Sequence, residues 1–344
     1  MLCTSAFAFI MLALSVAAHP GVHDEYDTIK KREFLAGARR TISNCRENMF
    51  VHGIEDESIE RRAKLARKLR EDLRLPHREH ISKRSFATVL ATSHLSNKTG
   101  LSSSSPSTDV FSGSINCVLQ SETTEGPYWV KGELVRSDMS EGKPGIPLYT
   151  DYQIIDTNTC QPISNVYLDA WHANATGVYA GVVAKGNGNS ADESNLNTTF
   201  NRGITKTDHK GVGFFKTVFP GHYTGRAVHI HLLTTHNPTL HANHTITGGT
   251  ISHVGQVFFD QTLIDEVKTL SPYSTNKQTL TQNKADRIMS EEAGSMDPIM
   301  DYVWLGSSPY DGILAWITIG IDSKKSYSPH PAVILTSNGG AFNN

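Results

Sequence analysis

Short runs in which apolar or β-branched residues alternate with other residues recur through the second two-thirds of the chain. The clearest runs are 149–156, 165–171, 212–218, 227–235, 254–259 and 313–321. A period of two is typical of strands that bury one face. With the Gly- and Pro-containing turns between them, these runs predict a mainly β fold with a β-sandwich core. Helices are predicted at 261–270 and 284–292.

The N-terminal part has a different pattern, in which apolar residues follow a helical spacing. Residues 25–75 are highly charged, and Leu65, Leu69 and Leu73 recur there at four-residue steps. This spacing places the leucines on one face of a helix. We therefore predict a helical extension over 19–93, and composition alone is compatible with helices that pack on the sandwich.

A Ser-rich stretch at 94–114 separates the extension from the rest of the chain. Such a segment lacks the residues that build a core and is predicted to be a linker. The sandwich domain is then expected to span 115–344. Lys83 and Arg84, just before the linker, fit a dibasic processing point and equally fit ordinary surface charge.

The first 18 residues form an apolar run that ends in Val-Ala-Ala. This pattern predicts a signal peptide over 1–18, cleavage after Ala18, a mature chain that starts at His19, and a secreted, extracellular protein. A membrane anchor is the competing interpretation, but the run lacks a stop-transfer flank and is short for a bilayer span. No membrane association is expected after processing.

The cysteines are consistent with export. Removal of the signal peptide leaves Cys45, Cys117 and Cys160 in the mature chain. We favour a Cys117–Cys160 disulfide, which leaves Cys45 free or paired between chains; sequence does not fix the connectivity.

Asparagine sequons are also consistent with export. Asn97, Asn197 and Asn243 open Asn-x-Ser/Thr sequences and are candidate glycosylation sites. Asn174 opens a fourth, but a glycan there would crowd the chain leading to Tyr179, and we expect this site to stay bare. The formal charge of −2 over 344 residues argues against a nucleic-acid partner, which would favour a concentrated basic face.

Two tyrosines and a His-x-His pair form the most informative chemical pattern. They are Tyr179, Tyr223, His229 and His231. Phenolate oxygen suits hard Fe(III), and neutral imidazoles complete the shell. Zinc sites instead use Cys, His and carboxylates, and Fe(II) oxygenases use two His and one carboxylate. The set therefore points to non-haem iron that rests in the ferric state.

The spacing supports a shared metal. In a strand over 227–235, His229 and His231 lie on one face, whereas Ile230 and Leu232 lie on the other. A turn containing Gly221 and Gly225 can return the Tyr223 phenol to the same point. Each residue taken alone has a simpler interpretation, because buried Tyr and His are ordinary packing residues.

Five segments in order resemble the intradiol ring-cleavage dioxygenases, the family of catechol 1,2- and protocatechuate 3,4-dioxygenases. The segments are 124–130 (TEGPYWV), 169–179 (DAWHANATGVY), 201–223 (NRGITKTDHKGVGFFKTVFPGHY), 225–232 (GRAVHIHL) and 255–260 (GQVFFD). With the signal peptide, the secreted fungal-type branch looks closest. The resemblance implies a β-sandwich that holds Fe(III) and cleaves catechol-type rings with O2 to cis,cis-muconate-type products.

The resemblance also assigns roles to individual residues. Tyr223 is both a ligand and a catalytic residue that leaves with a catechol proton. Arg226 matches an arginine expected to stabilise ring charge, although strict strand parity would point it away from His229 unless the chain bends at Gly225. Gln256 matches a polar residue beside the metal.

Residues at the substrate mouth and a homodimer contact are also implied by the resemblance. Gly126, Pro127 and Tyr128 match a segment that lines the substrate mouth, where core packing is the simpler interpretation. In the family, N-terminal helices commonly form a homodimer contact.

Three rival functions remain at this point. A cupin would use His-x-His but needs a Glu shortly after, and Leu-Leu-Thr-Thr follows His231. A copper-dependent oxidase would use an N-terminal histidine such as His19, but charged helical sequence follows it. A non-catalytic secreted β-sandwich binding module would explain the fold but not two phenols and two imidazoles in family order. Metal analysis separates these functions.

Overall fold

The computed structural model describes Cys45, Met49 and residues 53–75, 126–293 and 297–343, together with the backbone of residues 117–119. Several predictions lie outside these residues: the signal peptide at 1–18, His19, the start of the helical extension, Lys83-Arg84, the linker at 94–114, and Asn97. The domain boundaries stay predictions.

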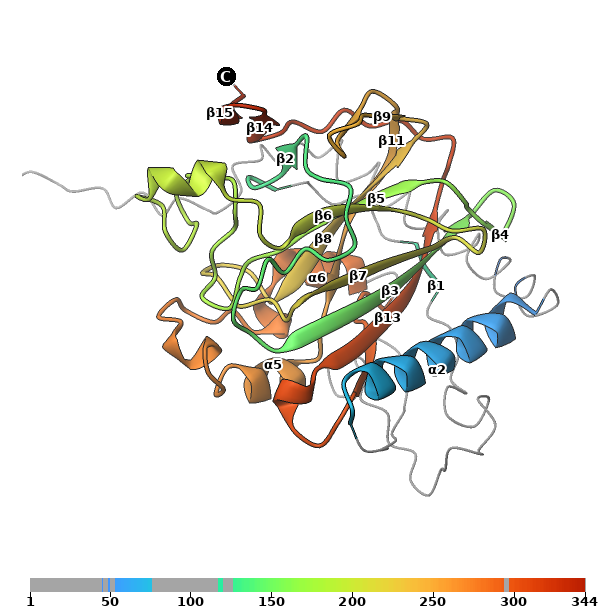
Figure 1. Cartoon of the computed structure of the whole chain (residues 1–344), viewed down its shortest axis with the longest axis horizontal. Coiled ribbons are helices and arrows are strands. Elements are labelled where there is room, and N and C mark those ends of the chain that lie inside the picture. Colours follow the sequence, from blue (N-terminus) through green and yellow to red (C-terminus); the bar gives the residue numbers. More distant parts are fainter. Residues whose placement is uncertain are drawn as a thin grey trace, which may run out of the picture.

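The described chain is mainly β, as predicted, and its strands form two large sheets (Figure 1). The first sheet has six strands, in the order β1-β13-β3-β4, with β12 beside β13 and β7 beside β3. Its strands are β1 (Cys117–Leu119), β3 (Pro147–Asp156), β4 (Gln161–Pro162), β7 (Val212–Val218), β12 (Asp301–Trp304) and β13 (Ile313–Ile321).

The second sheet has four antiparallel strands in the order β11-β8-β5-β6. They are β5 (Tyr167–Trp171), β6 (Arg202–Lys206), β8 (His229–His236) and β11 (Thr250–Phe258). Leu168 and Leu232 from this sheet share one hydrophobic core with Leu148, Phe215 and Ile317 from the first sheet. The two sheets therefore pack face to face, which confirms the predicted sandwich.

Smaller elements complete the fold. Two short sheets are formed by β2 (Val130–Lys131), β14 (Val333–Thr336) and β15 (Gly339–Phe342), and by β9 (Thr239–Leu240) and β10 (Ile246–Thr247). The helices whose bounds the structure describes are α2 (Ile54–Asp72), α5 (Gln261–Val267) and α6 (Arg287–Ala293). Single helical turns are η1 (Glu193–Asn197), η2 (Tyr273–Thr275), η3 (Asn283–Ala285) and η4 (Pro309–Asp311).

Helix α2 covers the outer face of the six-stranded sheet. Ala63 and Leu69 pack against Tyr149 and Trp316, and Arg62 forms a buried ion pair with Asp151 on β3, at 2.9 Å. The apolar face of α2 is therefore used within its own chain. A homodimer contact through the N-terminal helices stays a prediction, and in α2 it would need a different face.

Most predicted element bounds agree closely with the structure, and the exceptions have local causes. The run 165–171 becomes a strand only from Tyr167 onward, because Asn165 adopts a positive φ of 63°. β11 begins at Thr250, earlier than predicted, because a polar segment pairs with the end of β8 at His236.

The predicted Cys117–Cys160 disulfide is wrong, because Cys160 bonds Cys45. β1, which contains Cys117, is separated from β4 by both β13 and β3. Neighbouring strands lie roughly 4.8 Å apart, so Cys117 is beyond the 7 Å Cα separation that a disulfide tolerates. Cys45 and Cys160 have a Cα separation of 4.9 Å.

Within the described residues, no helix is both long enough and apolar enough to cross a membrane.

Candidate metal-binding site

The two histidines of the His-x-His pair project from β8 on the outer face of the four-stranded sheet. Ile230 and Leu232, which alternate with them, lie in the core between the sheets. The predicted parity is therefore confirmed. His231 stacks on Trp171 of the neighbouring strand, with ring centroids 4.8 Å apart and nearly parallel planes, and this contact fixes the plane of the imidazole.

Three donor atoms converge above this face. The Nε2 atoms of His229 and His231 are 3.0 Å apart, and the Tyr179 hydroxyl lies 3.3 Å from His229 Nε2. Two ligands that are each roughly 2.1 Å from one metal ion, at an angle between about 90° and 105°, would be separated by about 3.0 to 3.3 Å. The spacing of the donors is therefore the spacing of a shared coordination shell.

The backbone selects the tautomer of His229. Its Nδ1 lies 2.6 Å from the carbonyl oxygen of Ala227, which can only accept a hydrogen bond. Nδ1 must therefore carry the proton, and in the neutral ring Nε2 presents a lone pair toward His231 and Tyr179. This is the form in which an imidazole binds a metal.

Tyr223 completes the group from the turn between β7 and β8. Its ring centroid is 5.3 Å from that of Tyr179 and 5.7 Å from that of His229. Burial raises the pKa of Tyr179 well above its ordinary value and also raises that of Tyr223, whereas the charge of Arg226 acts in the opposite direction on both phenols. A cation bound between the phenols would favour their ionised forms.

In the described part of the chain, no group of three or more His, Cys, Asp or Glu side chains is placed to hold a metal. Beside the two imidazoles, the oxygen donors described on this face are the phenols of Tyr179 and Tyr223. This donor set fits ferric iron better than a zinc site or a two-His, one-carboxylate Fe(II) site.

Two buried asparagines hold Tyr179 by its backbone, and the sequence did not single them out. Asn187 accepts a hydrogen bond from the Tyr179 N–H at 2.8 Å and donates to its carbonyl at 2.9 Å. Asn195 donates to the same carbonyl at 2.8 Å, and both asparagines also donate to the carbonyl of Val182. The Tyr179 phenol therefore extends from a fixed backbone.

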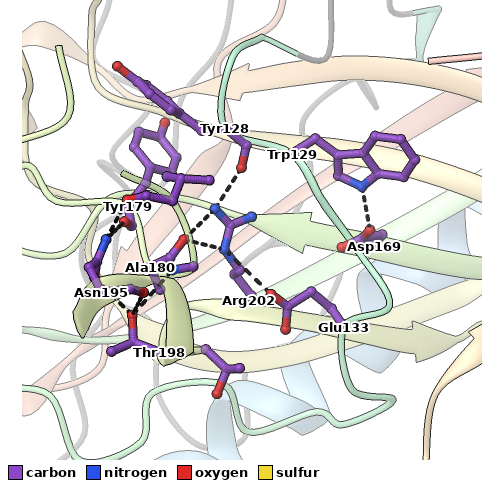
Figure 2. A network of polar contacts seen from close by, with 12 residues as sticks. Tyr128, Trp129, Glu133, Asp169, Tyr179, Ala180, Asn195, Thr198 and Arg202 are labelled. Carbon is purple, nitrogen blue, oxygen red and sulfur yellow. Dashed lines mark hydrogen bonds and ion pairs between the residues drawn. The ribbon is translucent and has the colours of Figure 1, made fainter. Parts of the chain in front are cut away.

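Arg202 connects the segment that contains Tyr179 and Ala180 to the segment that contains Tyr128 (Figure 2). Its guanidinium donates to the carbonyls of Tyr128 and Ala180, each at 2.6 Å, and Glu133 lies 3.6 Å from its Nε. Burial raises the pKa of Glu133 to about 8, against the opposing charge of Arg202. The Arg202 guanidinium thus serves mainly as a hydrogen-bond donor to backbone carbonyls of both segments.

Tyr128 lies against the candidate ligands. Its ring stacks on that of Tyr179 at 4.7 Å between centroids and meets that of Tyr223 edge-on at 5.8 Å. Gly126 and Pro127, which precede it, are half-buried. Contact of this segment with a substrate stays a prediction. The adjacent Trp129 donates to Asp169 at 3.1 Å, and burial raises the pKa of that carboxyl to about 7.

Arg226 and Gln256 meet beside the histidines, together with Asp286, which the sequence did not indicate. Arg226 donates to Gln256 at 2.5 Å and to Asp286 at 2.9 Å, and all three side chains are buried. Strand alternation does not direct Arg226 away from His229, because Arg226 lies before β8, which begins at His229. The chain also turns at Gly225, which has a φ of 94°.

The described sequons differ in exposure. Asn197 and Asn243 are exposed, whereas Asn174 is half-buried and its side-chain oxygen accepts hydrogen bonds from the backbone of Thr176 and Val178. Occupancy of all three stays a prediction.

Comparisons with known proteins agree with this geometry. A family model described as Dioxygenase matches residues 124–294, a range that includes all four candidate ligands. The chain is similar to an intradiol ring-cleavage dioxygenase from Tetranychus urticae, with 27% identity and a TM-score of 0.51, over 62% of this chain and 98% of that one.

Weaker similarity is found to the dioxygenase domain of a carbohydrate-binding fusion protein from Streptomyces, with 21% identity and a TM-score of 0.39 over 59% and 98% of the two chains. It is also found to 3-chlorocatechol 1,2-dioxygenase from Rhodococcus opacus, with 18% identity and a TM-score of 0.37 over 58% and 71%. No curated protein sequence matches the chain.

Proposed function

Since this chain belongs to the intradiol ring-cleavage dioxygenases, we propose that it holds one non-haem Fe(III) ion with the two tyrosines and two histidines of the site and opens catechol-type rings with O2. The reaction joins one catechol and one O2 to give a cis,cis-muconate-type product that contains both oxygen atoms. No external reductant is consumed.

The main support for the ferric site is the convergence of donor atoms. His229 Nε2 lies within 3.0 Å of His231 Nε2 and 3.3 Å of the Tyr179 hydroxyl, and the Ala227 carbonyl leaves the His229 lone pair directed at them. Two imidazoles and a phenol that meet at this spacing suit one ion with a preference for anionic oxygen, and the Tyr223 ring lies beside them, 5.3 Å from that of Tyr179 between centroids.

The ferric ion, when bound, would act as a Lewis acid for both oxygens of a catecholate. Tyr223, ionised while it holds the metal, would accept one substrate proton at its phenolate oxygen and move away as the neutral phenol to admit the diol. Tyr179 would stay in place, because its backbone N–H and carbonyl are both hydrogen-bonded. Tyr128, Pro127 and Gly126 would line the substrate mouth.

Arg226 would stabilise negative charge that develops on the ring, since it lies within electrostatic range of both phenols and is fixed by Gln256 and Asp286. Gln256 would orient the Arg226 guanidinium. Because Gln256 pairs with His231 across the neighbouring strands, it would also orient polar groups of molecules bound beside His231.

Secretion and placement in the fungal-type branch are further parts of the proposal. They are supported by the apolar segment at 1–18, by the Cys45–Cys160 disulfide, which suits an oxidising compartment, and by the exposure of Asn197 and Asn243.

Visible absorption tests the metal assignment. The purified protein should contain one iron and show a phenolate-to-Fe(III) charge-transfer band. Tyr179→Phe and Tyr223→Phe should each alter the band, and His231→Ala should largely lose the iron. Tyr128→Phe is the matched control, because its ring stacks on Tyr179 while its hydroxyl points to the carbonyl of Lys185. A variant with both Tyr179→Phe and Tyr223→Phe that kept full colour would contradict the assignment of these tyrosines as iron ligands.

Isotope labelling tests the reaction. Catechol with ¹⁸O₂ should give a muconate labelled in both carboxyl groups, apart from exchange with water before release. A yellow semialdehyde would instead mean extradiol cleavage. Copper in place of iron would favour the copper oxidase, and a metal-free, inactive protein would favour the binding module.

A further inference from the structure

The segment at 276–281, here called the brace, connects the two loops that carry the phenols. It runs between Tyr273 and Asn283, which are buried and bonded to the sandwich. The Tyr273 hydroxyl donates to the carbonyl of Phe219 at 2.7 Å, and Asn283 donates to the carbonyl of Phe259 at 2.8 Å. The brace is therefore held firmly at both ends.

One set of brace contacts reaches the turn on both sides of Tyr223. The Asn276 side chain donates to the carbonyl of His222 at 2.7 Å, and the Gln278 side-chain oxygen accepts from the N–H of Thr224 at 3.1 Å. The Thr281 hydroxyl accepts from the N–H of Gly225 at 3.2 Å. The backbone next to Tyr223 is thus fixed while its side chain is left out of the network.

The other set of contacts reaches the loop that leads to Tyr179. The Gln278 amide nitrogen donates to the carbonyls of Gly177 at 3.0 Å and Thr176 at 3.3 Å. Gly177 has a φ of 80°, and a Cβ there would collide with the Gln278 amide and the His222 carbonyl. One amide side chain therefore bonds both phenol-bearing loops at once.

We infer that Asn276 and Gln278 are positioning residues that set where Tyr223 returns relative to Tyr179. This inference rests on the proposed function, in which Tyr223 leaves when the diol binds. With its flanking backbone fixed, Tyr223 moves by side-chain rotation and returns to one place. Its return helps to displace the product.

Loosening the brace has a specific kinetic consequence. A turn that no longer holds Tyr223 competes less well with the substrate, so KM falls. The same turn returns Tyr223 less effectively when the product must leave, so kcat falls as well. Simple damage to the fold would instead lower kcat/KM.

The test compares Gln278→Ala and Asn276→Ala with Lys277→Ala, a control at the exposed residue that separates them in the sequence. In the metal-free protein, hydrogen exchange of the Thr224 amide should rise roughly 2- to 10-fold in Gln278→Ala, the factor expected for loss of one hydrogen bond. Gln278→Glu keeps an acceptor for that amide and should restore slow exchange.

In the iron-loaded protein, Gln278→Ala should keep its iron, shift the visible band, and lower kcat and KM together by a similar factor. Exchange, band and kinetics equal to those of Lys277→Ala would overturn the inference, as would faster exchange with unchanged kinetics. Failure of the ferric site itself would appear differently, because the unaltered protein would then bind no iron.

Discussion

The guanidinium of Arg226 and the carboxylate of Asp286 form a buried ion pair, with 2.9 Å between Nε and Oδ2. The same carboxylate oxygen accepts from the N–H of Ala227 at 2.7 Å, and the other oxygen accepts from the N–H of Met289 at the start of α6. Asp286 thereby fixes the turn before β8 and the direction of the arginine together.

Removal of the Arg226 charge should slow the chemical step more than it weakens binding. We expect Arg226→Ala to retain iron, colour and catecholate binding while turnover falls by about 10²–10³, the usual effect of losing one preorganised electrostatic donor. Arg226→Lys should recover part of the rate, because a point charge cannot contact Asp286 and Gln256 as a planar fork does. Single-turnover kinetics with O2 measure the effect.

The matched control for that experiment is Arg287→Ala, in which an exposed arginine bonded to Glu291 is lost. Its turnover should stay normal, since exposed ion pairs contribute little. If Arg226→Ala behaved like this control, the buried cation would have only a structural role.

Asn187 should matter more for stability than Asn195. In Asn187→Ala, Asn195 still bonds the carbonyls of Tyr179 and Val182, but the buried N–H of Tyr179 loses its acceptor. We expect a loss of about 1–3 kcal/mol in the free energy of unfolding, the penalty of one buried unsatisfied donor. Asn195→Ala should lose less, because Asn187 keeps its bonds to both carbonyls.

Urea unfolding of the two variants, with Asn189→Ala as a control away from the Tyr179 backbone, measures the difference. Equal losses in Asn187→Ala and Asn195→Ala would contradict the assigned roles.

His172 should make folding stability fall in acid. Its Nδ1 donates to the Ala173 carbonyl, and in the neutral ring its Nε2 can then accept from the Thr217 hydroxyl. Burial lowers the pKa of His172 from 6.5 to about 4. The unfolded chain therefore takes up the proton first as pH falls. This contribution is fully present above pH 6.5 and declines by about 3 kcal/mol as pH approaches 4.

His172→Asn keeps a donor for the Ala173 carbonyl but cannot titrate, so its stability should depend less on pH in that window. Chemical unfolding at several pH values measures both proteins. Identical slopes would show that His172 does not contribute. The acid dependence would then come from the other histidines whose pKa burial lowers, which are His222, His236 and His253.

The Cys45–Cys160 bond should stabilise the whole chain, because it closes a loop with a sequence separation of 115. The chain-entropy model gives a stabilisation on the order of 4–5 kcal/mol for a loop of this size. Cys45→Ser should lower the unfolding free energy substantially, whereas Cys117→Ser should leave the Cys45–Cys160 bond in place. Non-reducing peptide mapping identifies the linked pair, and a peptide joining Cys117 to Cys160 would contradict the structure.

Sequence patterns predicted the parts of the molecule that depend on local alternation. β7 and β13 have the bounds that their apolar periods indicated, and His229 and His231 share a face because Ile230 and Leu232 are buried on the other. The positions of the two phenols follow from a resemblance rather than from any period.

Contacts between segments that are far apart in the chain could not be predicted from the sequence. Asp286 and Gln278 follow Tyr223 by dozens of residues, and no period or motif connects them to it. The predicted disulfide was wrong for a similar reason. Cys45 reaches the turn after β3 in a region where Met49 and Ile54 pack against Ile155 of β3, a contact between segments far apart in the sequence. The direction of Arg226 depended on the residue at which β8 begins, which alternation does not fix.

The disulfide also determines what proteolysis can release. Cys45 and Cys160 lie on either side of residues 46–159, a stretch that contains Lys83-Arg84 and the Ser-rich segment at 94–114. A single cut at either place would leave the two fragments covalently joined. Processing would therefore convert the protein into a two-chain molecule rather than shed its N-terminal region, and the fragments would separate only under reducing conditions.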